Sequence, residues 1–176
     1  HALHPLQRRY RVDHLMLNRR RLNDTFYTDT LFSKVKSMNG NTCAQVYSNG
    51  SFTKVFPMAD KTGARVGQTL TDFADDVGIP DTLVMDLAPE QAGKHTAMQT
   101  EARRLRVRIR YTEKGRSEQN HTAEGEIGQL KRRWKHRMTT KNVPRCLWDY
   151  GLVHEAEVLS ILARGKDQVP GLEKVL

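Results

Sequence analysis

Residues 25–57 read TFYTDTLFSKVKSMNGNTCAQVYSNGSFTKVFP, and this stretch decides the fold class. Its β-branched and aromatic residues predict strands at 25–33, 42–48 and 52–57, because such side chains suit a pleated sheet. The tetrapeptides NGNT and SNGS between them are typical of tight turns. Three strands joined by tight turns predict an antiparallel meander.

The pattern then changes from strand to helix and back again. Between residues 62 and 77 apolar side chains recur at intervals of three and four, which predicts a helix. The short apolar run DTLVMD at 81–86 follows, and it predicts a buried parallel strand. A helix at about 94–105 and a strand at about 106–112 come next.

Two more helices complete the predicted order, at about 122–138 and 146–163, with the helix-breaking VPR between them. The order βββ-α-β-α-β-α-α predicts an α/β fold with a mixed five-stranded sheet. We expect three antiparallel strands, then two parallel strands, with helices on both faces of the sheet.

The predicted core leaves a segment at each end. Residues 1–23, which include the cluster NRRR, indicate a basic N-terminal arm or a connector. Residues 24–164 form the expected core, and residues 165–176 a loose C-terminal tail. The chain begins at His1 with no Met before Met16. We therefore expect a fragment or a piece of a processed polyprotein, with flanking domains missing.

Charge gives the first indication of a partner. The 29 Lys and Arg residues outnumber the 20 Asp and Glu residues, so the net charge is +9 and the pI is about 9.8. This excess favours a polyanionic partner such as DNA, RNA or an acidic membrane face, over a merely soluble basic protein.

No apolar run approaches the ~18 residues of a membrane span. The two cysteines form no CxxC motif, which argues against a cysteine-based zinc site.

Three acidic residues have placements that suggest chemistry. Asp29 lies inside the first predicted strand, where a buried charge needs a partner or a metal. Asp86 closes the fourth strand, and α/β sheets place ligands at the carboxyl ends of parallel strands. Glu124 stands one turn before Ile127 on the same face of its helix.

Adjacent first and fourth strands would bring Asp29 and Asp86 together, and Glu124 could close the group from its helix. Three carboxylates suit Mg²⁺, and two ions would suit phosphoryl transfer. Each acid also has an ordinary structural explanation. A lone strand Asp usually faces solvent, and a Glu at a helix start complements the helix dipole. Asp24 is a weaker candidate because we expect it outside or at the edge of the strand.

Several blocks of the sequence are similar to one known family. They are DTFYTDTLFSKVKSMNGNTCAQVYSNG, DDVGIPDTLVMD, EQAGK, QNHTAE, LKRRWK and VPRCLWDYGLV. The region from about 22 to 164 resembles the catalytic core of retroelement integrases, particularly those of copia-type retrotransposons. The resemblance implies a ribonuclease-H-like fold and a polynucleotidyl transferase with an Asp-Asp-Glu triad. Carried onto this sequence, the triad is Asp29 in YTDT, Asp86 in LVMD and Glu124 in TAEGEI.

The resemblance also implies cofactors, partners and a location. Family enzymes bind two Mg²⁺ or Mn²⁺ ions and join the 3′ ends of element DNA to target DNA. We expect Asp29 and Asp86 to hold one ion, and Asp29 with Glu124 to hold the other. The resemblance further implies a homo-oligomer that acts in the nucleus, or resides in a virus-like particle before nuclear entry, with no membrane partner.

The sequence departs from the family pattern near these acids. Leu87 stands where a small Gly or Asn is common, and Glu118 where Pro is common. These departures keep open a catalytically dead DNA-binding remnant of a decayed element. A ribonuclease-H-like nuclease acting on a nucleic-acid duplex is the other alternative.

The predicted helix after Glu124 is strongly basic. Lys131 lies seven residues further on, two turns along nearly the same face, and the resemblance implies that it contacts the element's DNA end. Other candidate DNA-binding residues are Arg132 and Lys135 of this helix, and Gln119 and Asn120 of the preceding loop. Some of these basic residues would simply be solvated, and the loop would serve equally well as a plain connector. Phosphate contacts would make binding sensitive to salt.

Overall fold

The computed structural model describes residues 19–86, 96–112, 121–162 and 169–175, with the side chains of 121–124 left out. Its sheet has the strand order β3-β2-β1-β4-β5. The strands are β1 (Arg21–Phe32), β2 (Cys43–Ser48), β3 (Thr53–Met58), β4 (Ile79–Asp86) and β5 (Arg108–Thr112). β1, β2 and β3 are antiparallel, whereas β1, β4 and β5 run parallel. The predicted mixed sheet is confirmed, and β1 lies at its centre beside β4.

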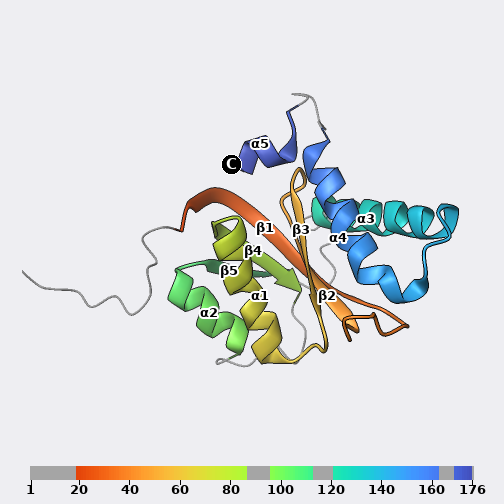
Figure 1. Cartoon of the computed structure of the whole chain (residues 1–176). Helices are drawn as coiled ribbons and strands as arrows, with labels where there is room; N and C mark the ends of the chain where they lie inside the picture. Colours follow the sequence, from red (N-terminus) through yellow and green to blue (C-terminus); the bar gives the residue numbers. More distant parts are fainter. Residues whose placement is uncertain (1–18, 87–95, 113–120, 163–168, 176) are drawn as a thin grey trace, which may run out of the picture.

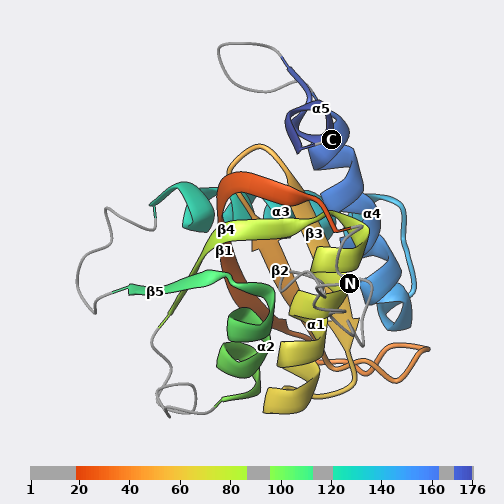
Figure 2. The ribbon, with the colours of Figure 1, turned by 90° about the vertical axis from the view of Figure 1, so that its left-hand side faces the viewer.

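Helices cover both faces of this sheet. α1 (Gly63–Asp76) and α2 (Ala97–Leu105) lie on one side, and α3 (His121–Thr140) and α4 (Trp148–Ile161) on the other (Figure 1). A short 3₁₀ turn, Arg145–Leu147, precedes α4. In the orthogonal view α1 and α2 stand in front of the sheet, with α3 and α4 behind it (Figure 2). The helices therefore bury both faces of the sheet at β1, β2 and β3, whereas no residue of the edge strand β5 is fully buried.

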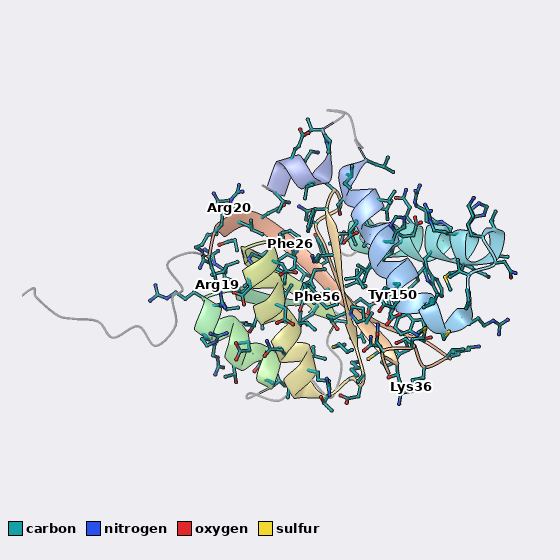
Figure 3. The ribbon with its side chains drawn as sticks, viewed as in Figure 1. Arg19, Arg20, Phe26, Lys36, Phe56 and Tyr150 are labelled. Carbon is teal, nitrogen blue, oxygen red and sulfur yellow. The ribbon has the colours of Figure 1, made fainter. Side chains whose placement is uncertain are left out.

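The core on the α1 side is aromatic. Phe73 of α1 stacks on Tyr47 of β2, with ring centroids 4.8 Å apart, and meets Phe26 of β1 edge-on at 5.0 Å. Phe26 and Phe56 lie on this side of the sheet (Figure 3). The sequence predicted this helix from the spacing of its apolar residues, and the same residues form its buried face.

The core on the α3 side joins β1, β2 and β3 to both helices through residues such as Leu31, Val46, Leu130 and Leu159. Polar contacts hold α3 and α4 together. Glu155 of α4 is 1% exposed and forms ion pairs with Arg133 and Arg137 of α3. The two helices are thus fixed to each other as well as to the sheet.

The first strand begins earlier than predicted. β1 starts at Arg21 because its first residues pair with the start of β4, and the Arg21 guanidinium donates to the carbonyl oxygens of Leu105 and Arg106. Asp24 therefore lies within β1, contrary to the expectation that it lies outside or at its edge. Its carboxylate accepts a hydrogen bond from Asn49 Nδ2 at 2.5 Å.

The end of the chain also differs from the expectation of a loose tail. Gly171–Val175 forms the short helix α5, and Val175 is buried in the core on the α1 side. Gly171 sits so close to the Ser51 backbone that a Cβ would not fit. The prediction was wrong because tertiary contacts, not local periodicity, order these residues. No helix among the described residues is long and apolar enough to cross a membrane.

The connection between β1 and β2 is anchored by a buried carboxylate. Asp149 of α4 is 1% exposed and accepts hydrogen bonds from the side-chain amides of Asn39 and Asn41, at 3.3 and 2.9 Å. Burial by itself raises the pKa of Asp149. Hydrogen bonds from Asn41, Ser37, the Tyr150 backbone and Asn39 outweigh it, so the pKa lies below its usual value. In Figure 3 Tyr150 marks this contact region.

Candidate catalytic site

Asp29 and Asp86 meet at the centre of the sheet. Thr28 pairs with Met85 in the parallel register of β1 and β4, so the next residue of each strand, Asp29 and Asp86, lie side by side. Asp29 pairs across β1 and β2 with Val46, a member of the core on the α3 side. Because side chains alternate along a strand, both acids project toward the face that carries α3.

Hydrogen bonds orient both carboxylates. The backbone N–H of Thr30 donates to Asp29 Oδ1 at 2.7 Å. Thr112 is the partner of Asp86 in the β4–β5 register, and its hydroxyl donates to Asp86 Oδ1 at 2.6 Å. The two acids therefore stand in defined positions: Asp86 at the carboxyl end of β4, where α/β sheets place ligands, and Asp29 beside it within β1.

The electrostatics place a third group near the acids. Although the Asp29 side chain is exposed overall, partial burial of its carboxyl group raises its pKa. The N–H of Thr30 and the charge of Lys131 lower that pKa, the charge of Asp86 raises it, and Lys61 lowers it. The pKa of Asp29 is therefore affected both by a second carboxylate, Asp86, and by a lysine of α3, Lys131.

The third predicted acid, Glu124, lies in the first turns of α3, and its side chain is outside the described atoms. By helical periodicity positions 124, 131 and 135 share one stripe of α3. Among the described residues no three metal-ligating side chains gather into one group. Asp29 and Asp86 nevertheless fit as two ligands of a hard divalent cation, since Mg²⁺ prefers carboxylate oxygens.

The sequence matches no protein-family model and no curated protein sequence. Solved structures are similar in fold. A chain of the simian T-cell lymphotropic virus intasome, determined in complex with PP2A regulatory subunit B56 gamma, aligns over 87% of this chain with a TM-score of 0.68 and 16% identity. This chain spans about half, 54%, of that one.

Two catalytic core domains align over nearly their whole length. The HTLV-2 integrase catalytic core domain, solved in complex with magnesium in a trimeric form, has a TM-score of 0.65 and 13% identity, covering 88% of this chain and 97% of its own. The BIV integrase catalytic core domain has a TM-score of 0.68 and 11% identity, covering 87% and 93%. The chain has the ribonuclease-H-like fold of integrase catalytic cores. The expected fold class is thereby confirmed.

Within this fold the predicted DNA-binding residues separate into two groups. Lys131 and Lys135 are exposed on α3 and line a hollow of about 380 Å³ beside the end of β1. Arg132 lines a different hollow, of about 430 Å³, together with Arg133 and Arg137. Gln119 and Asn120 lie outside the described residues. The segment KRRWKHR of α3 therefore presents two basic surfaces in the described part of the chain, and the one with Lys131 and Lys135 reaches Thr30, next to Asp29.

Sequence reasoning missed two features of the site. Thr112 was placed only at the end of a predicted strand, and its contact with Asp86 follows from the register of β4 and β5. Trp134 was not singled out, yet its side chain lines the hollow with Lys131. Nothing in the local sequence signals either role, because each depends on which element lies alongside.

Proposed function

We propose that this chain is the catalytic core of a retroelement integrase that joins the 3′ ends of element DNA to target DNA with divalent metal ions. One observation carries the proposal. Asp29 within β1 and Asp86 at the carboxyl end of β4 lie side by side on two parallel strands, in a fold shared with integrase catalytic cores. The sequence blocks that resemble copia-type integrases support the retrotransposon type.

The residues of the site would divide the work as follows. Asp29 and Asp86 would hold one ion, and Asp29 with Glu124 the other. Bound there, two ions supply activation of the attacking oxygen and stabilisation of the leaving 3′ oxygen in an in-line displacement. The hydrogen bonds from Thr30 and Thr112 hold the two aspartates in place, so little reorganisation is needed when the ions bind.

Lys131 would serve as a phosphate contact. Its charge acts on Asp29, so a DNA phosphate bound to Lys131 would lie near the metal site. Lys135, one turn further along α3, would extend this contact along the strand. Arg132 would contact a phosphate outside the hollow, and Gln119 and Asn120 would approach the DNA from the preceding loop. A net charge of +9 favours such contacts.

The wider assignments follow from the same proposal. The partners would be element DNA ends and target DNA, and the active form a homo-oligomer, as the intasome and the trimeric core of similar fold suggest. The protein would act in the nucleus, or reside in a virus-like particle before nuclear entry. It would be released from a polyprotein.

The test compares Asp86→Asn with Asp24→Asn, which also replaces a strand aspartate but lies away from β4's carboxyl end. Each protein is assayed with Mg²⁺ or Mn²⁺ for joining a duplex with a recessed 3′ end to a second duplex, and for Mn²⁺ binding by titration. We expect Asp86→Asn to lower the rate of DNA joining and the affinity for Mn²⁺ by at least about a hundredfold each, because the loss of a metal ligand or of a group that supports one has effects of this size. Asp24→Asn should retain both.

Equal joining by Asp86→Asn and the parent would exclude Asp86 as a ligand. A parent that binds DNA but neither joins it nor binds Mn²⁺ would be a catalytically dead remnant. Metal-dependent cleavage of an RNA–DNA hybrid, without joining of DNA ends, would assign the site to a ribonuclease-H-like nuclease. Either of the last two results would overturn the proposed integrase activity.

A further inference from the structure

A hollow of about 380 Å³ opens beside the catalytic acids, between the end of β1 and helices α3 and α4. Its wall begins at Thr30, one residue after Asp29, and continues through Phe32. Lys131, Trp134 and Lys135 of α3 line the opposite side. A volume of this size falls in the range of about 300–1,000 Å³ that small ligands occupy.

The hollow combines aromatic surface with positive charge. Phe32 is 67% exposed, an unusual state for a large apolar side chain, and Trp134 is half-buried. Lys131 and Lys135 are exposed one helical turn apart on α3. None of the described lining residues is acidic. Aromatic faces beside lysines are what proteins use to stack bases and hold phosphates of single-stranded nucleic acid.

One of the residues that line the hollow, Trp148, carries a buried hydrogen-bond donor. Its Nε1–H has no hydrogen-bond partner in the described part of the chain. By contrast, the Nε1–H of Trp134 donates to the Trp148 carbonyl at 3.1 Å. A buried donor without an acceptor is unfavourable in a folded protein.

We propose that this hollow takes one unpaired nucleotide of the DNA strand bound at the acids. The base lies against Phe32 and Trp134, and the flanking phosphates lie on Lys131 and Lys135. A duplex is too wide for a hollow of this size, so the ligand is an unpaired end. The inference rests on the proposed function, because it supplies a specificity element for the same DNA end.

The test uses 2-aminopurine, a fluorescent base, placed either in a short single-stranded overhang of a duplex or paired within it. The full chain is titrated with each duplex in Mg²⁺-free buffer. Stacking on Phe32 and Trp134 should quench the overhang probe and leave the paired probe unchanged. Phe32→Ala should weaken binding of the overhang duplex about tenfold and remove the quenching, because each stacked base contributes on that scale.

Two matched variants control for loss of surface area and of charge. Met38→Ala removes a side chain that is 71% exposed in the β1–β2 connection, which follows Phe32, and that does not line the hollow. Lys36→Ala removes an exposed lysine of the β1–β2 connection that lines neither this hollow nor the one at Arg132, to be compared with Lys135→Ala. Both controls should bind the overhang duplex like the parent. Phe32 and Lys135 are exposed, so their replacement should leave thermal unfolding unchanged.

Equal quenching of the paired and unpaired probes would overturn the inference. So would equal effects of Phe32→Ala and Met38→Ala on binding of the overhang duplex. A change in the oligomeric state of Phe32→Ala, measured by sedimentation, would overturn it too. The last would assign the hollow to a second copy of the chain. DNA joining is measured separately. Joining without overhang quenching would leave the proposed function and remove the inference. Quenching without joining would leave a nucleotide site and remove the proposed function.

Discussion

Asp86 lies beside Asp29 on the same face of two adjacent parallel strands, and its negative charge is one of the groups that raise the pKa of Asp29. The backbone pairing of β1 with β4 holds the two residues side by side, so the carboxylates cannot move apart to reduce their repulsion. The N–H of Thr30 and the positive charges of Lys131 and Lys61 lower the pKa of Asp29, and the Thr112 hydroxyl donates to Asp86. The arrangement is unfavourable for stability and favourable for binding a divalent cation.

Removing one of these two charges should stabilise the metal-free protein. Asp86→Asn keeps an oxygen that can accept from Thr112 and ends the repulsion of Asp29. We expect its Tm without metal to rise by roughly 1–3 °C. The parent should gain stability when Mg²⁺ or Mn²⁺ is added, since a ligand that binds only the folded state stabilises it, whereas Asp86→Asn should not. Differential scanning calorimetry with and without metal measures both effects, and a lower Tm for metal-free Asp86→Asn would contradict the first.

The carboxylate of Asp149 should make stability depend on pH. Its pKa in the folded protein lies below the ordinary value of 3.8. Its contribution is therefore complete above about pH 4 and is lost as the pH falls through the folded-state pKa. Asp149→Asn should cost about 1–3 kcal/mol at pH 7, and less at pH 3. Urea unfolding at both values measures the difference.

Asp76→Asn provides the matched control for that pH dependence. Asp76 is exposed and pairs with Lys54 at 3.1 Å on the surface, an interaction worth about 0–1 kcal/mol. Its replacement should change stability little at either pH. A difference between parent and Asp149→Asn that stays constant from pH 7 to pH 3 would show that the ionised form of Asp149 does not matter.

The buried Glu155 should be far more important for stability than its exposed neighbour Glu157. Glu155→Ala leaves Arg133 and Arg137 without their shared partner. Removing one side of a buried ion pair is strongly destabilising. The two arginines reach solvent, with 37% and 39% of their side chains exposed, so we expect a loss of about 2–3 kcal/mol. Glu157→Ala should stay within about 0.5 kcal/mol. Chemical denaturation compares the two variants, and equal losses would refute the role given to Glu155.

Local sequence patterns predicted most elements of this fold. The three antiparallel strands followed from turn residues between β-branched runs, and α1 from the spacing of residues such as Leu70 and Phe73. These features are local, because a strand or helix repeats its apolar positions along the chain. The start of β1 at Arg21 and the helix α5 escaped prediction, since each depends on distant partners, β4 for the first and Ser51 for the second.

By itself, the sequence determined the mixed α/β order, the basic charge and the choice of Asp29 and Asp86 as candidates. Only the tertiary structure decided that these two acids lie side by side, that Thr112 holds Asp86, and that Lys131 and Lys135 share a hollow with Phe32 and Trp134. The reason is physical. The periodicity of a segment sets which side chains share its face, whereas strand order and register set which faces meet.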